Sequence, residues 1–164
     1  MSRKINEKVT AIVLIFFTSF MISCGGGGAG DDPDTTPQPT AEELQIAKIA
    51  GTVSKTWTAT AITFNGAPSE SYSNPSAFSI TFRTAKTYST NAGSPVFQAS
   101  GNWNFNTGNL NSLIFDSNQN SIASISGLNT AGTQMTLTID YELASAGGKI
   151  EAINGRYVFT LTAN

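Results

Sequence analysis

From residue 52 onward, the chain repeatedly alternates apolar and polar residues. The clearest runs are residues 78–82, 135–143 and 157–161. A period of two places one face of a strand in a core and the other in water, which is typical of antiparallel sheets. Thr fills many of the polar positions, as suits an exposed β surface with few charges. This part of the chain is therefore predicted to be built from half-buried strands.

Short turn sequences separate these runs, and Asn65-Gly66 and Asn154-Gly155 have the composition of tight hairpin turns. The connections are too short for helical crossovers between parallel strands. The pattern predicts an all-β fold, an eight- or nine-stranded antiparallel meander forming a barrel or sandwich. The strands are expected near residues 53–63, 77–83, 86–90, 97–105, 110–116, 121–126, 134–144 and 156–162, with a further short one at 149–153.

One short helix is expected before the strands, at residues 41–50. Thr40 is positioned as its N-cap, with Glu43 three residues later to complete a capping box, and Gly51 is placed to end it. We expect this helix to pack against, or plug, the strands that follow, and its apolar side consists of Leu44, Ala47 and either Lys48 or Ile49.

The amino terminus has a different pattern, in which Arg3, Lys4 and Lys8 precede an apolar run of 14 residues at 9–22. A helix that crosses a bilayer needs about 20 residues. A basic lead followed by a short apolar run is typical of a secretory signal peptide. Residues 1–23 are therefore predicted to be a signal peptide.

The end of this run, Met21-Ile22-Ser23-Cys24, resembles the bacterial lipobox. The resemblance implies cleavage before Cys24, which is the one cysteine of the chain, and a lipid such as palmitate on the new amino terminus. The alternatives are an uncleaved membrane anchor and a plain secretory signal followed by an unrelated cysteine. Lipid would make the membrane a partner of the protein through Cys24.

Residues 24–40 are rich in Gly, Pro and Asp and contain no large apolar side chain. Such a composition cannot bury a core, so we expect a disordered tether. The folded domain is then expected at residues 41–164.

The composition excludes several kinds of site. The chain has no His and 1 Cys, so it can form neither a Ser-His-Asp triad nor an internal disulfide, and a Cys/His zinc site is equally excluded. Its net charge of −2 argues against nucleic-acid binding. We expect no cofactor, no metal and no catalysis.

The β region resembles the small lipocalin-like domains of Bacteroidota lipoproteins. That resemblance implies a lipocalin-like barrel on the cell outer membrane, on either the periplasmic or the surface side. The residues that carry it are the helix at 41–50, Trp57, Asn65-Gly66 and the runs 78–82, 93–105 and 155–161.

Aromatic residues are the main candidates for contact with a ligand. A binding pocket is predicted to be lined by Trp57, Trp103, Tyr88 and Phe82. The alternative is that these four side chains fill the core. Both outcomes occur in eight-stranded barrels, and an enclosed cavity would favour the first.

Two groups of polar residues are candidate chemical sites. Asp140 and Glu142 lie two residues apart on one strand face, the arrangement of a carboxylate pair, but a solvated outer face explains them equally well. Residues 116–120, Asp-Ser-Asn-Gln-Asn, have the start of a calcium-loop pattern without its Gly and Glu, which favours a turn.

Three functions follow, in order of preference. The first is a non-catalytic, outer-membrane-anchored barrel that binds a small apolar or amphipathic ligand or an envelope partner. The second is a structural or adhesion module with a filled core, whose surface, rich in Ser, Thr and Asn (53 of the 164 residues), contacts glycans or envelope proteins. The third is a hydrolase that uses carboxylates alone. The sequence leaves the oligomeric state open.

Overall fold

The computed structural model describes residues 37–118, 121–142 and 153–164, and its folded unit spans Gln38–Asn164. Four sequence predictions lie outside the described residues: the signal peptide at 1–23, the lipid on Cys24, all but the last residues of the tether, and nearly all of the strand at 149–153.

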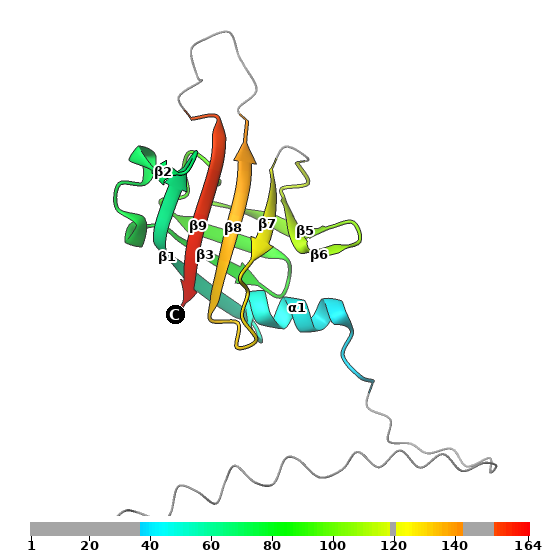
Figure 1. The fold of residues 1–164 in the computed structure, drawn as a ribbon. Helices are drawn as coiled ribbons and strands as arrows, with labels where there is room; N and C mark the ends of the chain where they lie inside the picture. Colours follow the sequence, from blue (N-terminus) through cyan, green and yellow to red (C-terminus); the bar gives the residue numbers. More distant parts are fainter. Residues whose placement is uncertain (1–36, 119–120, 143–152) are drawn as a thin grey trace, which may run out of the picture. The chain divides into compact units, whose positions relative to one another are not determined.

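Nine strands and one α-helix make up the described fold (Figure 1). Their bounds are α1 (Ala41–Ala50), β1 (Ser54–Phe64), β2 (Ala67–Pro68), β3 (Ser79–Arg83), β4 (Thr87–Asn91), β5 (Ser100–Asn106), β6 (Asn109–Phe115), β7 (Ile122–Ser126), β8 (Gln134–Tyr141) and β9 (Gly155–Ala163), with the 3₁₀ turns η1 (Glu70–Tyr72) and η2 (Pro75–Ala77) between β2 and β3.

The strands form a closed antiparallel barrel, which confirms the predicted all-β class. From β3 to β9 each strand pairs with the next, and β1 pairs with both β3 and β9 to close an eight-stranded ring. The short β2 pairs only with β1, across the turn Asn65-Gly66, whose φ angles of 50° and 86° are those that Asn-Gly favours in a tight hairpin.

Strand β1 contains a bulge that changes which residues face inward. Its pairing with β9 shifts register between Ala59 and Ala61, so Thr60 is the extra residue. Trp57 and Ala59 are buried before the bulge, and Ile62 is buried after it. A bulge shifts by one residue which side chains of a strand face inward, and it bends the strand. The bend allows β1 to pair with both β3 and β9.

Helix α1 packs across one end of the barrel (Figure 1). Its capping box is formed as predicted: Thr40 Oγ1 accepts from the Glu43 amide at 3.2 Å, and the Glu43 carboxylate accepts from the Thr40 amide at 2.7 Å. Ile49 and Ala50 are fully buried. Of the side predicted to pack, Ile49 is buried as expected, but Leu44 and Ala47 are exposed, because the helix docks through its last turn and leaves Leu44 51% exposed.

Two connections cover the opposite end. The Tyr72 hydroxyl on η1 donates to the Gly93 carbonyl at 2.6 Å and so links the β1–β3 connection to the β4–β5 loop. Phe97 lies in that loop, not in a strand as the sequence suggested, because its amide bonds to Gly93. Its ring packs on Phe78, Phe115 and Phe159.

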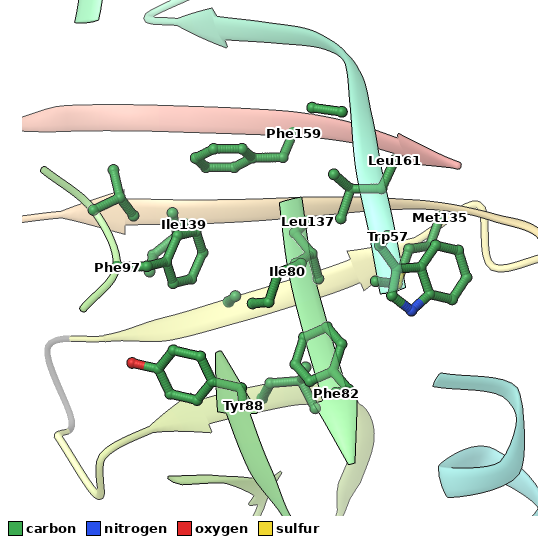
Figure 2. Close-up of a cluster of buried hydrophobic side chains, with 14 of the residues drawn as sticks. Trp57, Ile80, Phe82, Tyr88, Phe97, Met135, Leu137, Ile139, Phe159 and Leu161 are labelled. Carbon is green, nitrogen blue, oxygen red and sulfur yellow. The ribbon is translucent and has the colours of Figure 1, made fainter. Parts of the chain in front are cut away.

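The core lies inside the barrel and is largely aromatic. Figure 2 shows inward side chains from several strands meeting between Trp57, near α1, and Phe97, near the other end. Every residue of the buried core cluster lies within Gln38–Asn164, so we expect this fragment to fold on its own.

Candidate functional site

The four aromatic residues predicted to contact a ligand all face the barrel interior. Trp57 on β1, Phe82 on β3, Tyr88 on β4 and Trp103 on β5 are each at most 2% exposed. The Phe82 and Trp103 rings pack edge to face, with centroids 5.5 Å apart. The structure places all four in one core cluster, and ligand contact by them stays a prediction.

Trp57 is held by the end of α1. Its indole Nε1 donates to the Ile49 carbonyl at 2.8 Å, which satisfies one of the carbonyls that a helix leaves unpaired at its carboxyl end. Lys55 Nζ donates to the Lys48 carbonyl at 2.7 Å and lies 5.5 Å from the Trp57 ring centroid. Partial burial lowers the pKa of the Lys55 ammonium. These contacts fix the last turn of α1 onto β1.

Tyr88 is held by a carboxylate that the sequence did not single out for it. Its hydroxyl donates to Asp116 Oδ2 at 2.7 Å, and the Asn102 amide donates to Asp116 Oδ1 at 2.8 Å. Burial, followed by the neighbouring Asp116 carboxylate, raises the pKa of Tyr88. The phenol therefore stays protonated and donates at neutral pH.

Gly101 makes this arrangement possible. A Cβ atom at residue 101 would lie 2.0 Å from Asp116 Oδ1, so a larger residue would displace the carboxylate. Asp116 is also the first residue of the calcium-like pattern, and its carboxylate accepts hydrogen bonds from Tyr88 and Asn102. Residues 119–120 of that pattern lie outside the described residues. Among the described residues, no cluster of three or more His, Cys, Asp or Glu could hold a metal ion.

Trp103 differs from Trp57 in its hydrogen bonding. Its Nε1 is the one buried side-chain polar atom in the described part of the chain without a hydrogen-bond partner. Buried donors are nearly always paired in folded proteins, because an unpaired one costs about 1–3 kcal/mol. This donor is therefore a candidate contact for a group from outside the protein.

The carboxylate pair considered for hydrolysis lies in solvent. Asp140 is 64% exposed at its side chain and accepts two hydrogen bonds from Arg156, at 2.8 and 3.0 Å. The hydrogen bond from Arg156 lowers the pKa of Asp140, away from the range of a general acid. Glu142 is also exposed. This geometry gives a carboxylate-only hydrolase no support.

The cations that could attract an anionic ligand are each paired with another group. Lys86 Nζ lies 2.7 Å from the Glu42 carboxylate and 3.0 Å from Asn104 Oδ1. Arg83 donates to the Ser89 hydroxyl at 3.3 Å. Arg156 is paired with Asp140, so each of these three cations has a polar partner within the barrel.

The outer surface of β7, β8 and β9 is dominated by hydroxyl groups. Direct cross-strand partners include Ser126 with Thr136 and Thr136 with Thr160. No side-chain hydrogen bond from these hydroxyls reaches another described residue. We call this surface the hydroxyl face; it consists of Ser124, Ser126, Thr136, Thr138, Thr160 and Thr162.

Charge is almost absent from these three strands. They contain two charged residues, Asp140 and Arg156, which neutralise each other at one end. The sequence indicated polar outer faces rich in Thr. Which of these hydroxyl side chains lie next to each other depends on which strands are neighbours and on their register. Both follow from the closed barrel, whereas local alternation fixes only one strand at a time.

Comparisons with known proteins leave the family open. A scan against protein-family models and searches of curated proteins and solved structures found no match. In the described residues, no helix has both the length and the apolar character needed to cross a bilayer. The resemblance to lipocalin-like lipoproteins therefore stays a prediction.

Proposed function

We propose that this protein is a lipid-anchored, non-catalytic envelope module that contacts a neutral, hydroxyl-rich partner such as a glycan through the hydroxyl face. The observation that carries the proposal is the pair of cross-strand contacts Ser126–Thr136–Thr160 on a surface with almost no charge. The anchor is the lipid predicted on Cys24, and the outer membrane is the predicted location.

The interior supports this choice over capture of a large apolar ligand. Two of the side chains expected to line a pocket, Phe82 and Trp103, pack on each other, and Phe159 lies in ring contact with Tyr72, Phe78 and Phe97. A barrel of eight strands has an interior just wide enough to be filled by its own side chains or to hold one small ligand. The proposed contact with a large, hydroxyl-rich partner is therefore placed on the outer surface.

The chemistry of the hydroxyl face fits a neutral partner. Each hydroxyl both donates and accepts a hydrogen bond. Neighbouring strands lie about 4.7–4.9 Å apart, and alternate residues of one strand about 6.6 Å apart, so the face offers a closely spaced array. A charged partner would find no opposite charge to compensate its desolvation. For a chain of sugar hydroxyls the free-energy cost of desolvation is small, because each hydroxyl exchanges a hydrogen bond to water for one to a protein hydroxyl.

Binding of neutral polysaccharides by the fragment Gln38–Asn164 tests the proposal. We expect dextran or mannan to bind and the acidic polymer alginate to bind more weakly, as measured by calorimetry. Replacing one cross-strand pair, Thr136→Val with Thr160→Val, should weaken binding about tenfold, since each lost hydrogen bond contributes about 0.5–1.5 kcal/mol.

A matched control pair lies elsewhere on the barrel. Thr56 and Thr81 are also direct cross-strand partners, with their hydroxyl oxygens 2.8 Å apart. The double change Thr56→Val with Thr81→Val should leave polysaccharide binding unchanged. Equal loss in both double variants, or no binding of any neutral polymer, would contradict the proposal.

The anchor is tested separately in the native host. Cys24→Ser should abolish acylation and release a soluble form, whereas Ser23→Ala, which keeps a small residue before the cysteine, should leave the protein with the membrane. Continued membrane association of the Cys24→Ser variant would contradict the lipid anchor without bearing on the hydroxyl face.

A further inference from the structure

The two tryptophans of the chain offer an internal comparison. Both are buried, on β1 and β5, and both carry one indole donor. Trp57 Nε1 donates to the Ile49 carbonyl at 2.8 Å, whereas Trp103 Nε1 has no partner among the described residues. The barrel therefore satisfies one donor with its own helix and leaves the equivalent donor to be satisfied by something else.

The surroundings of Trp103 are aromatic. Its ring meets Phe82 and Phe105 edge to face, with centroids 5.5 and 5.6 Å away and interplanar angles of 81° and 89°. Phe105 is itself only partly buried. Neither ring provides an oxygen, and an aromatic face is a weak acceptor. A guest at this point would meet flat apolar walls and one strong donor.

The cover beside Trp103 is made of polar contacts. The Trp103 amide bonds to the Lys86 carbonyl, and the Lys86 side chain pairs with Glu42 on α1. Gln45, also on α1, donates to the Leu110 carbonyl of β6 at 3.1 Å. The amino-terminal half of α1 thus holds to the β3–β4 turn and the β5–β6 hairpin through exposed or partly exposed groups.

The two halves of α1 therefore differ in how firmly they are docked. The last turn buries Ile49 and Ala50 and is fixed by Trp57 and Lys55. Exposed ion pairs and hydrogen bonds such as Lys86–Glu42 contribute little to stability. The first turns are therefore held mainly by polar contacts, with Ile46 alone of their apolar neighbours packed against the core.

We propose that the barrel end beneath the amino-terminal half of α1 binds a small, flat, mostly apolar molecule carrying one carbonyl or carboxylate oxygen. That oxygen accepts the hydrogen bond from Trp103 Nε1, and the apolar part lies against Phe82 and Phe105. The site is independent of the hydroxyl face, which lies on the outside of β7, β8 and β9.

Nuclear magnetic resonance of the fragment Gln38–Asn164 tests this directly, because two tryptophans give two indole N–H signals. The probes are benzamide, which has the oxygen, and toluene, which has a similar shape without it. Benzamide should shift the Trp103 signal downfield in a saturable manner and leave the Trp57 signal in place, and toluene should cause no such downfield shift. Trp57→Phe identifies the signals.

Two variants sharpen the result. Trp103→Phe should weaken benzamide binding at least tenfold, whereas Thr136→Val with Thr160→Val should leave the Trp103 shift unchanged. An unmoved Trp103 signal at 10-millimolar benzamide (about ten-thousandfold above a micromolar affinity) would overturn the proposal. So would a long-lived water bonded to Trp103 Nε1 that benzamide does not displace.

Discussion

The inside and the outside of the barrel use the same alternating sequence for different purposes. On β8, Met135, Leu137 and Ile139 are buried, while Thr136 and Thr138 between them face outward. Inward positions are aromatic or aliphatic and pack on one another. Most outward positions on β7–β9 are small hydroxyl side chains, interrupted by Gln134, Val158 and the Asp140–Arg156 pair. Under the proposed function, the inner face provides stability and the outer face provides recognition, so substitutions on the two faces should have different effects.

The largest effect is expected at the centre of the inner face. Phe159→Ala removes a fully buried ring and should lower the free energy of unfolding by about 3–5 kcal/mol. Thr160→Ala, the next residue along β9, faces solvent and should change it by less than about 0.5 kcal/mol. Urea denaturation monitored by circular dichroism measures both. Similar losses in the two variants would break the comparison.

A second large effect is expected where the inner face meets a carboxylate. Gly101→Ala would place a Cβ atom 2.0 Å from Asp116 Oδ1 and should destabilise the fold by about 1–3 kcal/mol through overpacking. Asp116→Gly removes the carboxylate and suits the φ of 53° at this position. The clash predicts strong coupling between Gly101→Ala and Asp116→Gly. Additive losses of unfolding free energy in the double variant would contradict it.

The two tryptophans sharpen the comparison within the core. Trp57→Phe and Trp103→Phe remove the same volume, but only the first leaves a carbonyl, that of Ile49, without its donor. Trp57→Phe should therefore cost about 1 kcal/mol more in unfolding free energy than Trp103→Phe. Thermal and urea denaturation of the matched pair check this. A larger loss at Trp103 would mean that its indole has a partner inside the protein.

The smallest effect is expected at the exposed ion pair of β8 and β9. Arg156 lowers the pKa of Asp140 in the folded state, so the pair stabilises the fold above the unfolded pKa of Asp, about 3.9, and this contribution is lost as pH falls through the lower folded value. Arg156→Gln should reduce the melting temperature slightly at pH 7 and not at pH 2. An equal reduction at both pH values would contradict this assignment.

Local features of the sequence were sufficient for much of the fold. The helix runs from Ala41 to Ala50 as predicted, because its N-cap, capping box and terminal glycine all lie within the segment. Most strands were placed within a few residues, because alternation with a period of two reports burial on one face. Asn65-Gly66 formed its turn for an equally local reason.

Features that depend on distant contacts were not predicted. The bulge at Thr60 arises because β1 must pair with both β3 and β9. The η1 turn is fixed by Tyr72 bonding to Gly93, and nothing near Tyr72 in the sequence indicates that partner. The candidate sites have the same origin: the hydroxyl face requires strand register, and the unpaired Trp103 donor requires knowledge of every neighbouring acceptor.

The most direct test of the separation between faces is methyl nuclear magnetic resonance of Gln38–Asn164 during titration with dextran. The account predicts that the Thr136, Thr138 and Thr160 methyl signals shift while those of the buried Leu113, Leu137 and Leu161 stay in place. Shifts confined to the buried leucines, with the threonine signals unmoved, would contradict it.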